Sequence, residues 1–332
     1  MSSFPRIWAL LGEKVGDNNQ LLALAEGLGL PFETRPMRYN LGRAVPPRFL
    51  GATLRTLTAG SRRWLQPPWP DVVLAIGRRS VPVARWVRKA SGGRSRLVLV
   101  GHPRVDPEHF DLVLTTHQYP VPRQGNVTVL PLAMSRLRDP GPPTDAEQAW
   151  LAKLPRPHLL LALGGPTKYW DLDPSEVSGQ ARALLERARD QDGTVIAVSS
   201  RRTPGPVVEA VRAELGTEGR FADGVMPRFS LLMSDADEIF VTADSVSMLS
   251  EAIQTGKPVG MVPISLSAKG RRIIGEDGAS PSGRRDLRRI WMALTDNGLV
   301  GTVAEPAAGR GEVVALDQAV GAVRRLLQEQ RA

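Results

Sequence analysis

Cysteine is absent from this sequence, and histidine occurs only four times in 332 residues. Without cysteine, disulfides, cysteine-ligated zinc, iron–sulfur clusters and thiol nucleophiles are excluded. So few histidines argue against a multi-metal enzyme, and we expect no metal site. Long apolar runs are also lacking, because none approaches the roughly 20 residues that a membrane-spanning helix needs.

The N-terminus has one short apolar run followed by charges, which indicates a first strand rather than a signal peptide. We therefore expect a cytoplasmic protein, either free or peripheral on the inner face of the cytoplasmic membrane. At roughly 150 residues per domain, the length indicates about two domains.

Acidic residues are scarce in the first part of the chain. Residues 1–140 contain 20 Lys and Arg but 9 Asp and Glu, and residues 35–104 contain a single acid, Asp71. A positive field of this kind favours phosphates in nucleic acid, anionic lipid or a pyrophosphate-bearing substrate. Nucleic acid is disfavoured because neither an aromatic stacking platform nor a recognition helix is evident. A general enrichment in arginine is the alternative, although it explains poorly a surplus confined to one half.

Short apolar runs alternate with helical stretches throughout the chain. Runs rich in Val, Ile and Leu with little polar alternation are typical of strands buried on both faces of a parallel sheet. In the first half, strands are expected at 6–11, 32–37, 71–77, 96–101, 111–116 and 126–132, and helices at 18–29, within 47–65 and at 80–91.

A Pro/Gly-rich stretch at 138–145 is the best candidate for a linker, and the pattern restarts after it. The sequence predicts an α/β fold of two Rossmann-like αβα domains facing across a cleft, residues 1–140 and 150–310, followed by a C-terminal helix within 311–332. In the second half, strands are expected at 158–163, 194–199, 238–242 and 258–263, and helices at 175–190, 206–215, 246–255 and 312–331.

Ligands of open parallel sheets bind beyond the carboxyl ends of the strands, so the residues after each strand are candidates. The first strand is followed by polar residues at a helix start, where free backbone N–H groups favour an anion. Asp17 is interpreted either as the helix N-cap or as a general base for an acceptor hydroxyl. The candidate acceptor or phosphate contacts in this turn are Lys14, Gly16, Asn18, Asn19 and Gln20.

Further candidates follow the third, fourth and fifth strands. Arg78 and Ser80 suit a phosphate, although Ser80 also fits an ordinary N-cap. His102 and Arg104 are candidate acceptor or phosphate contacts, and His117 is a candidate proton acceptor. The histidine spacing does not match a zinc site.

In the second half, glycines directly after a strand allow a ligand to approach the backbone closely. Gly164, Gly165 and Lys168 form one such loop, and a second contains Ser199, Ser200, Arg201 and Arg202. The Asp-x-Asp of Asp171 and Asp173 is not read as a metal site, because Asp173 has the pattern of a helix N-cap followed by Pro.

The stretch 242–252 combines a strand end, hydroxyl groups at a helix start and a carboxylate on that helix. The helix start can hold a diphosphate, and the carboxylate can accept two ribose hydroxyls. Its candidate donor-binding residues are Thr242, Ser245, Ser247 and Glu251.

This stretch is similar to the nucleotide-sugar site of GT-B glycosyltransferases, above all the lipid-linked GlcNAc transferase of peptidoglycan synthesis. Ser250-Glu251 and the turn at 256–258 carry that similarity. The whole chain resembles the ELM family, named for a plant mitochondrial-fission protein. The matching segments are 16–20, 103–104, 164–166, 199–204 and 242–252, whereas Gln118 stands after His117 where the family more often has Asp.

The resemblance implies a metal-independent GT-B transferase. The C-terminal domain would hold a nucleoside-diphosphate sugar as substrate, with no cofactor, and the N-terminal domain a lipid-linked or cell-envelope acceptor. Asp17 or His117 would deprotonate the attacking hydroxyl. A nucleotide-sugar epimerase and a non-enzymatic adaptor at a membrane surface are the alternatives.

The segment 48–69 has two interpretations, one of which is a contact with a membrane surface. Arg48, Arg55 and Arg62 recur every seven residues, and Trp64 and Trp69 add aromatic rings, as in an interfacial helix on an anionic membrane. The alternative is an amphipathic helix that packs on the core and exposes its basic face to solvent.

Overall fold

The computed structural model describes residues 4–134, 139–222, 226–275, 284–308 and 315–329. The chain forms two compact units: unit 1 contains residues 1–136 and 314–332, and unit 2 contains residues 137–313. The expected linker 138–145 follows this division, with residue 138 outside the described residues and Asp145 beginning helix α5.

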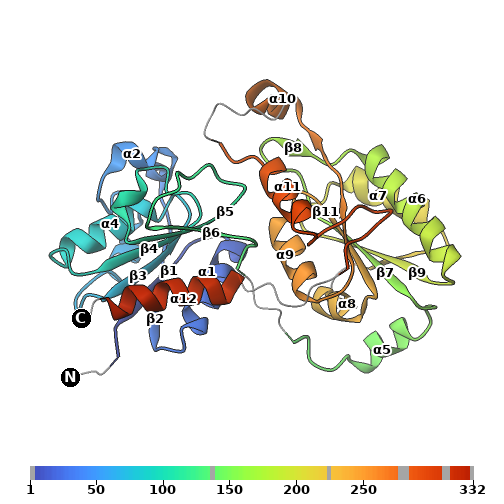
Figure 1. The fold of residues 1–332 in the computed structure, drawn as a ribbon, viewed down its shortest axis with the longest axis horizontal. Coiled ribbons are helices and arrows are strands. Elements are labelled where there is room, and N and C mark those ends of the chain that lie inside the picture. Colours follow the sequence, from blue (N-terminus) through green and yellow to red (C-terminus); the bar gives the residue numbers. More distant parts are fainter. Residues whose placement is uncertain (1–3, 135–138, 223–225, 276–283, 309–314, 330–332) are drawn as a thin grey trace. The chain divides into compact units, whose positions relative to one another are not determined.

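Unit 1 is built on a six-stranded sheet in the order β2-β1-β3-β4-β5-β6, with all strands parallel. All six expected strands are confirmed. They are β1 (Ile7–Leu11), β2 (Phe32–Pro36), β3 (Val72–Ile76), β4 (Arg96–Val100), β5 (Leu112–Thr116) and β6 (Val127–Leu130). Helices α1 (Val15–Gly27) and α4 (Val81–Ala90) connect strands of this sheet (Figure 1).

Burial on both faces was wrongly expected for β2. This edge strand pairs only with β1, and Glu33, Thr34 and Pro36 are exposed or nearly so. The inner strands β3 and β5 are buried along almost their whole length, as their unbroken apolar runs require.

The last helix, α12 (Ala315–Gln328), belongs to unit 1 although it ends the chain. It packs against α1, β5 and β6, beside α1 in Figure 1. Arg324 donates from Nη2 to the carbonyl oxygen of Leu28 at 3.2 Å. An amphipathic helix at the end of the chain thereby covers a face of the first sheet.

Unit 2 contains a five-stranded parallel sheet in the order β10-β9-β7-β11-β12. The four expected strands are confirmed, and the three-residue edge strand β10 was not predicted. The strands are β7 (His158–Leu163), β9 (Thr194–Ser199), β10 (Arg220–Ala222), β11 (Glu238–Thr242) and β12 (Val259–Val262).

Helices flank this sheet, and those expected at 175–190, 206–215 and 246–255 are confirmed. A small antiparallel pair, β8 (Trp170–Asp171) with β13 (Ser265–Leu266), lies outside the main sheet. The helices are α5 (Asp145–Leu151), α6 (Pro174–Asp190), α7 (Gly205–Leu215), α8 (Phe229–Asp235), α9 (Val246–Gln254), α10 (Ala268–Ile274) and α11 (Arg288–Asp296).

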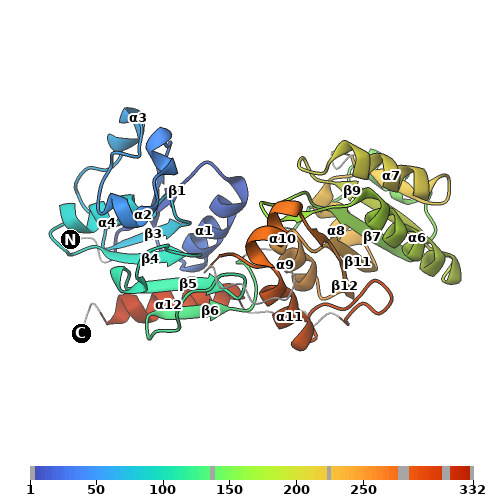
Figure 2. The same cartoon turned by 90° about the horizontal axis from the view of Figure 1, so that it is seen from above.

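The expected interfacial helix within 48–69 is wrong. The segment contains two separate four-residue helices, α2 (Pro47–Leu50) and α3 (Ala59–Arg62), drawn apart in Figure 2. Gly51 ends α2 with a φ of +59°, a conformation that continues no helix. Arg48, Arg55 and Arg62 therefore do not share one helical face.

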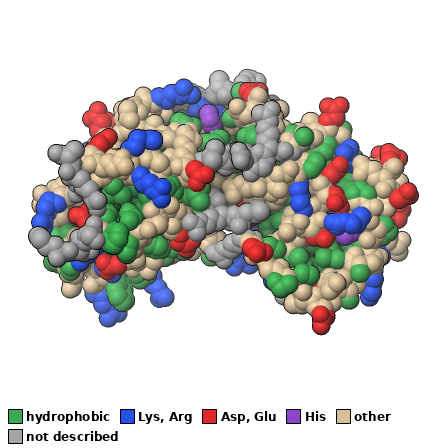
Figure 3. Space-filling view, turned by 60° about the horizontal axis from the view of Figure 1, so that its bottom comes forward, with side chains coloured by type: hydrophobic (Ala, Val, Ile, Leu, Met, Phe, Trp, Pro, Cys, Tyr) green, Lys and Arg blue, Asp and Glu red, His purple; other side chains and the backbone are tan. Residues whose placement is uncertain are grey.

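Packing decides the course of this segment. Leu57 is fully buried in the core of unit 1, and the Trp69 ring packs edge-on against Trp8 with 5.9 Å between centroids. Trp64, in contrast, is half exposed. On the face drawn in Figure 3, basic side chains lie among hydrophobic and acidic ones on both units. Within the described part of the chain, no helix is both long and apolar enough to cross a bilayer.

A buried histidine anchors the amino end of the second sheet. Nδ1 of His158 lies 2.6 Å from a carboxylate oxygen of Asp235, and Nε2 lies 3.2 Å from the carbonyl oxygen of Leu154. Burial tends to raise the pKa of Asp235, but the hydrogen bond with His158 and the charge of Arg156 outweigh it and lower that pKa below its usual value.

Replacing this histidine should destabilise unit 2. His158→Phe removes the closer of the two described partners of the Asp235 carboxylate and leaves only Arg156, so we expect a loss of about 1–3 kcal/mol in the free energy of unfolding, measured with urea. Because a lowered carboxyl pKa stabilises above the unfolded value near 3.9, the wild type should lose this contribution as the pH falls through the folded pKa. Arg182→Ala, which breaks an exposed ion pair with Glu214, is the control and should change stability little. Equal effects of the two variants would contradict the anchoring role.

Candidate functional site

The carboxyl ends of the parallel strands in unit 2 lie along one edge of the sheet, and one carboxylate joins the loops that follow β7, β9 and β11. Asp244, just after β11, has a side chain with 0% exposure. Its Oδ2 accepts a hydrogen bond of 2.8 Å from the backbone N–H of Gly165, in the loop after β7. Its Oδ1 accepts one of 2.7 Å from the Thr242 hydroxyl, which itself accepts from the N–H of Gly164.

The glycine pair is required for this close approach. A Cβ atom on Gly164 would lie 2.3 Å from both oxygens of Asp244, and one on Gly165 would lie 2.4 Å from the carbonyl oxygen of Arg202. The sequence analysis predicted that these glycines admit a ligand. In the structure they admit the two neighbouring loops, which brings three strand ends together.

The loop after β9 completes the cluster. Ser200 and Thr203 donate from their hydroxyls to the carbonyl oxygen of Gly164, at 3.1 and 2.5 Å. These bonds hold the loop against the glycine pair and leave Arg201 and Arg202 exposed at its tip. Arg202 also reaches Asp244, with 3.4 Å between Nη2 and Oδ2.

Burial raises the pKa of Asp244, while hydrogen bonds from Gly165 and Thr242 and the charge of Arg202 oppose that rise. A carboxyl group in this setting costs free energy, which its donors offset. Asp244 is absent from the site residues predicted above, although its place directly after a strand is a usable signal. Thr242, predicted to bind the donor, is fully buried and is engaged within this network instead.

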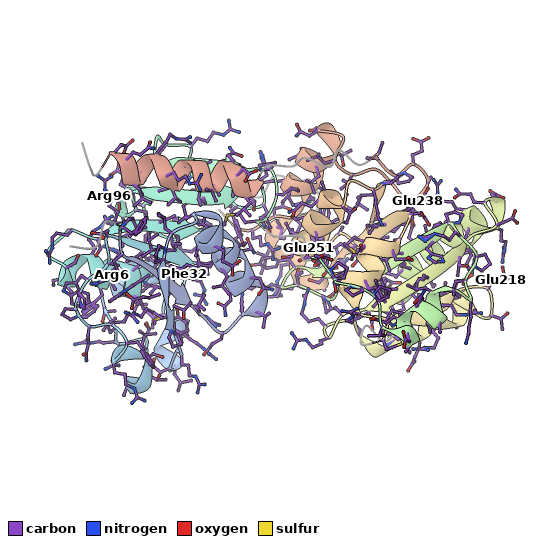
Figure 4. The ribbon with its side chains drawn as sticks, turned by 90° about the horizontal axis from the view of Figure 1, so that it is seen from below. Arg6, Phe32, Arg96, Glu218, Glu238 and Glu251 are labelled. Carbon is purple, nitrogen blue, oxygen red and sulfur yellow. The ribbon has the colours of Figure 1, made fainter. Side chains whose placement is uncertain are left out.

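Helix α9 begins immediately after Asp244. Ser245 is its N-cap residue, but the side chain makes no capping hydrogen bond. Ser247 and Glu251, one turn apart, lie on the partly exposed face of the helix, with Glu251 labelled in Figure 4. Ser250 is buried and its hydroxyl donates to the carbonyl oxygen of Val246 at 2.7 Å. The sequence-predicted Ser247 and Glu251 are therefore presented together next to the loop cluster.

Aromatic and cationic side chains lie beside the same loops. Nε1 of Trp291 in α11 donates to the carbonyl oxygen of Ala243 at 2.8 Å, which fixes the loop before Asp244. The Tyr169 hydroxyl accepts from Arg284 at 2.9 Å, and Nζ of Lys168 lies 5.2 Å from the centre of the same ring. Burial tends to raise the pKa of Tyr169, but these two cations lower it overall. Lys168 is thus a cation near the glycine loop, as predicted.

Asp173 has the structural role that the sequence predicts. Its carboxylate accepts hydrogen bonds from the N–H groups of Ser175 and Glu176 at the start of α6. No group of three or more His, Asp or Glu side chains that could hold a metal occurs within the described residues.

The corresponding edge of unit 1 carries the predicted acceptor residues. Glu13, in the turn after β1, accepts hydrogen bonds from Arg43 at 2.9 Å and from Arg79 at 3.1 Å. Asp17 lies 3.8 Å from the Lys14 ammonium and is close to Gly77, the residue that follows β3. The turns after β1 and β3 are thereby adjacent, and the sequence analysis had left Glu13 unassigned.

Several predicted residues of this edge have internal roles. Lys14, not Asp17, is the N-cap residue of α1, so the capping interpretation of Asp17 is wrong. The Asn18 amide closes the turn by bonding both N–H and carbonyl of Gly12. Ser80 is the N-cap residue of α4, as one interpretation predicts, but its buried hydroxyl donates to the carbonyl oxygens of Ile76 and Gly77 and makes no capping hydrogen bond. Gly16, Asn19 and Gln20 lie in the first turns of α1.

The two histidine loops follow β4 and β5. Nδ1 of His102 lies 3.2 Å from the backbone nitrogen of Arg104, whose φ is +61°, and the His102 ring packs edge-on against Tyr119. His117 is partly buried, and this burial, together with the charge of Arg123, lowers the pKa of its imidazole. A lowered pKa favours the neutral imidazole, which is the form that accepts a proton. Gln118 beside it is buried and donates to Thr116.

Comparison with known proteins shows the family and the fold. The sequence model of the family described as "Mitochondrial fission ELM1" matches residues 15–276. Mitochondrial fission protein ELM1 of Arabidopsis thaliana is 27% identical over 250 residues, which cover 67% of this chain and 58% of that relative. The chain thus spans less than two thirds of the length of this relative.

Solved structures that are similar to this chain over nearly its whole length include three whose descriptions name UDP or a UDP-sugar. The MnaA–UDP co-structure from S. aureus has a TM-score of 0.53 at 14% identity, over 98% of this chain and 97% of that chain. Arabidopsis thaliana UGT89C1 complexed with UDP-L-rhamnose has a TM-score of 0.52 at 11% identity, over 99% and 100%. UDP-GlcNAc 2-epimerase from Methanocaldococcus jannaschii has a TM-score of 0.50 at 13% identity, over 97% and 99%. At these identities the likeness concerns the fold, and it confirms the predicted GT-B type of α/β architecture.

The role of the glycine pair is tested by adding one methyl group. Gly164→Ala should lower the free energy of unfolding by about 1–3 kcal/mol, because the new Cβ displaces the Asp244 carboxylate. Gly179→Ala, in helix α6 with nothing within 4 Å of the new Cβ, is the matched control and should stabilise by up to about 1 kcal/mol. Thermal unfolding of both variants measures the difference. A neutral Gly164→Ala would contradict the close packing of the loops.

Proposed function

The chain belongs to the mitochondrial fission ELM1 family, and from this premise and its GT-B fold we propose that it is a metal-independent glycosyltransferase. It moves a sugar from a nucleoside-diphosphate sugar to a lipid-linked or cell-envelope acceptor. Unit 2 holds the donor, and unit 1 provides the acceptor contacts and the base.

The loop cluster centred on Asp244 is the observation that carries the proposal. Its hydrogen bonds hold the loops after β7, β9 and β11 together within the protein itself, and an edge fixed in this way is preorganised for a donor. Proteins of the same fold are described with UDP or UDP-L-rhamnose bound, which supports a nucleotide sugar as the ligand of this edge.

The donor contacts follow from charge and position. Arg201, Arg202 and Lys168 are exposed cations at the edge and can neutralise the diphosphate, together with the first-turn N–H groups of α9. Ser245 and Ser247 add hydroxyls at that helix start. The Glu251 carboxylate, one turn further along, accepts two ribose hydroxyls.

The transfer step needs a base and a stabilised leaving group. The acceptor oxygen attacks the anomeric carbon, its proton passes to the base, and the bond between that carbon and the diphosphate oxygen breaks. His117 can take this proton because its lowered pKa favours the neutral imidazole. Asp17, a partly exposed carboxylate beside Gly77, is the other candidate. The cations of unit 2 stabilise the departing diphosphate in place of a metal.

Donor binding is tested by thermal unfolding with UDP-, GDP-, CDP-, ADP- and dTDP-sugars. One nucleotide class should stabilise the protein, by about 2.7 kcal/mol at a hundredfold excess over its dissociation constant. Glu251→Ala should remove most of this stabilisation without unfolding the protein, because the ribose hydroxyls lose their acceptor. Glu209→Ala removes an exposed carboxylate from α7 and is the control for charge. This variant should bind the donor as the wild type does. If none of the five classes stabilises the protein, the result would favour the adaptor alternative. If the sugar of the donor changes its stereochemistry without being transferred, the result would favour an epimerase.

The identity of the base is tested by the pH profile of nucleoside diphosphate release in the presence of membrane-lipid extract. If His117 is the base, the rate should fall as the pH drops through its lowered pKa, and His117→Asn should abolish this limb and reduce kcat about 10²–10⁴-fold. Asp17→Asn should then leave the limb in place. The reverse result would assign the base to Asp17.

A further inference from the structure

A small basic pocket lies within unit 1, apart from the loops of unit 2. It is partly open to solvent, its inner space holds about one water-sized group, and its lining includes three arginines, Arg43, Arg78 and Arg79. Its residues come from two regions, the segment between β2 and β3 and the loop after β3 together with the start of α4.

The charge within the pocket is only partly neutralised. Arg43 and Arg79 share the carboxylate of Glu13, at 2.9 and 3.1 Å. Arg78 is exposed and makes no ion pair with any described residue. Three guanidinium groups and one carboxylate leave a local charge of about +2, which matches the charge of a phosphate monoester near pH 7.

A buried hydroxyl lines the same pocket. Thr56 is 2% exposed, and its Oγ1 has no hydrogen-bond partner within the described part of the chain. An unsatisfied buried hydroxyl costs free energy, and such groups are rare in folded proteins. A ligand oxygen in the pocket would satisfy this hydroxyl, and Arg78 would supply a second, charge-assisted hydrogen bond.

The remaining wall is apolar. Val45 and Leu50 line the pocket. Phe49 in α2 is 70% exposed, and Leu41 in the short helical turn Leu41–Ala44 is 91% exposed. Exposed apolar side chains can contact an apolar group of a ligand. One phosphate oxygen can enter the pocket while an apolar substituent extends over the apolar side chains outside it.

We propose that this pocket binds a phosphate monoester that carries an apolar group, either a soluble phosphorylated molecule or the headgroup of an anionic lipid. The proposal rests on the proposed function only where the occupant serves as acceptor. Binding itself requires no sugar nucleotide, so its failure and the failure of the transferase assignment are separate results.

The first test measures binding of hexyl phosphate and of inorganic phosphate to the whole protein by calorimetry. Hexyl phosphate should bind more tightly, because its chain contacts the apolar wall. Arg78→Ala and Thr56→Val should each weaken binding by about tenfold or more, since each removes one donor to the phosphate. Arg63→Ala is the matched control, because Arg63 is an exposed arginine of the same segment that does not line the pocket.

Thr56→Val also reports on folding. Because it removes an unsatisfied hydroxyl while keeping the shape, Tm should stay the same or rise while hexyl phosphate binding is lost. Unchanged binding in Arg78→Ala and Thr56→Val, or an equal loss in Arg63→Ala, would overturn the proposal. The absence of binding in the wild type to both hexyl phosphate and the vesicles described next would also overturn it.

Cosedimentation with vesicles distinguishes the two sources of the ligand. Phosphatidylcholine vesicles with phosphatidic acid present a phosphate monoester at a membrane, and pure phosphatidylcholine vesicles do not. Selective binding to the first, lost in Arg78→Ala and kept in Arg63→Ala, assigns the pocket to a lipid headgroup. Binding of hexyl phosphate without vesicle binding assigns it to a soluble ligand. Vesicle binding that both variants weaken equally would be general charge attraction and would count against the pocket.

Discussion

The buried carboxylate of Asp244 is the interaction on which the site in unit 2 depends. It lies where three parallel strands end, and it joins loops that are 79 residues apart in sequence. Two of its donors are themselves fixed, Gly165 by the close approach of Arg202 and Thr242 by the N–H of Gly164. Trp291 in turn fixes Ala243, the residue before Asp244. Burying the Asp244 carboxylate costs free energy, and its hydrogen-bond donors offset that cost. The carboxylate in turn fixes the positions of those donors.

This arrangement separates scaffold from contact residues. Side chains that point inward, such as Thr242 and Ser200, form hydrogen bonds within the loop cluster. Side chains on the outside, such as Arg201 and Glu251, keep partial or full exposure. A locked inner layer costs the protein no reorganisation when a ligand arrives, and electrostatic stabilisation depends on that property. Unit 1 follows the same plan, with Asn18 and Ser80 turned inward and Glu13 and Arg79 at the edge.

The segment between β2 and β3 shows how tertiary contacts override a local pattern. Arginine at every seventh position predicts one amphipathic helix, yet Gly51 and the burial of Leu57 divide the segment into two short helices. The basic side chains are then distributed over two short helices and their connecting loops, and a pocket forms between this segment and α4. The surplus of positive charge is visible in the sequence, whereas the gathering of three arginines around one pocket is not.

The sequence by itself determined the order and nearly the bounds of ten of the strands, because each is an apolar run between turn residues and helical stretches. It also determined the family and the positions of the strand-end motifs, including the capping role of Asp173. Only the tertiary structure decided that α12 returns to the first sheet, that the glycine pair serves Asp244, and that Thr242, Asn18 and Ser80 face inward. Each of these outcomes depends on contacts between segments that are distant in the chain. Local propensity and periodicity contain no information about such contacts, so folding alone settles them.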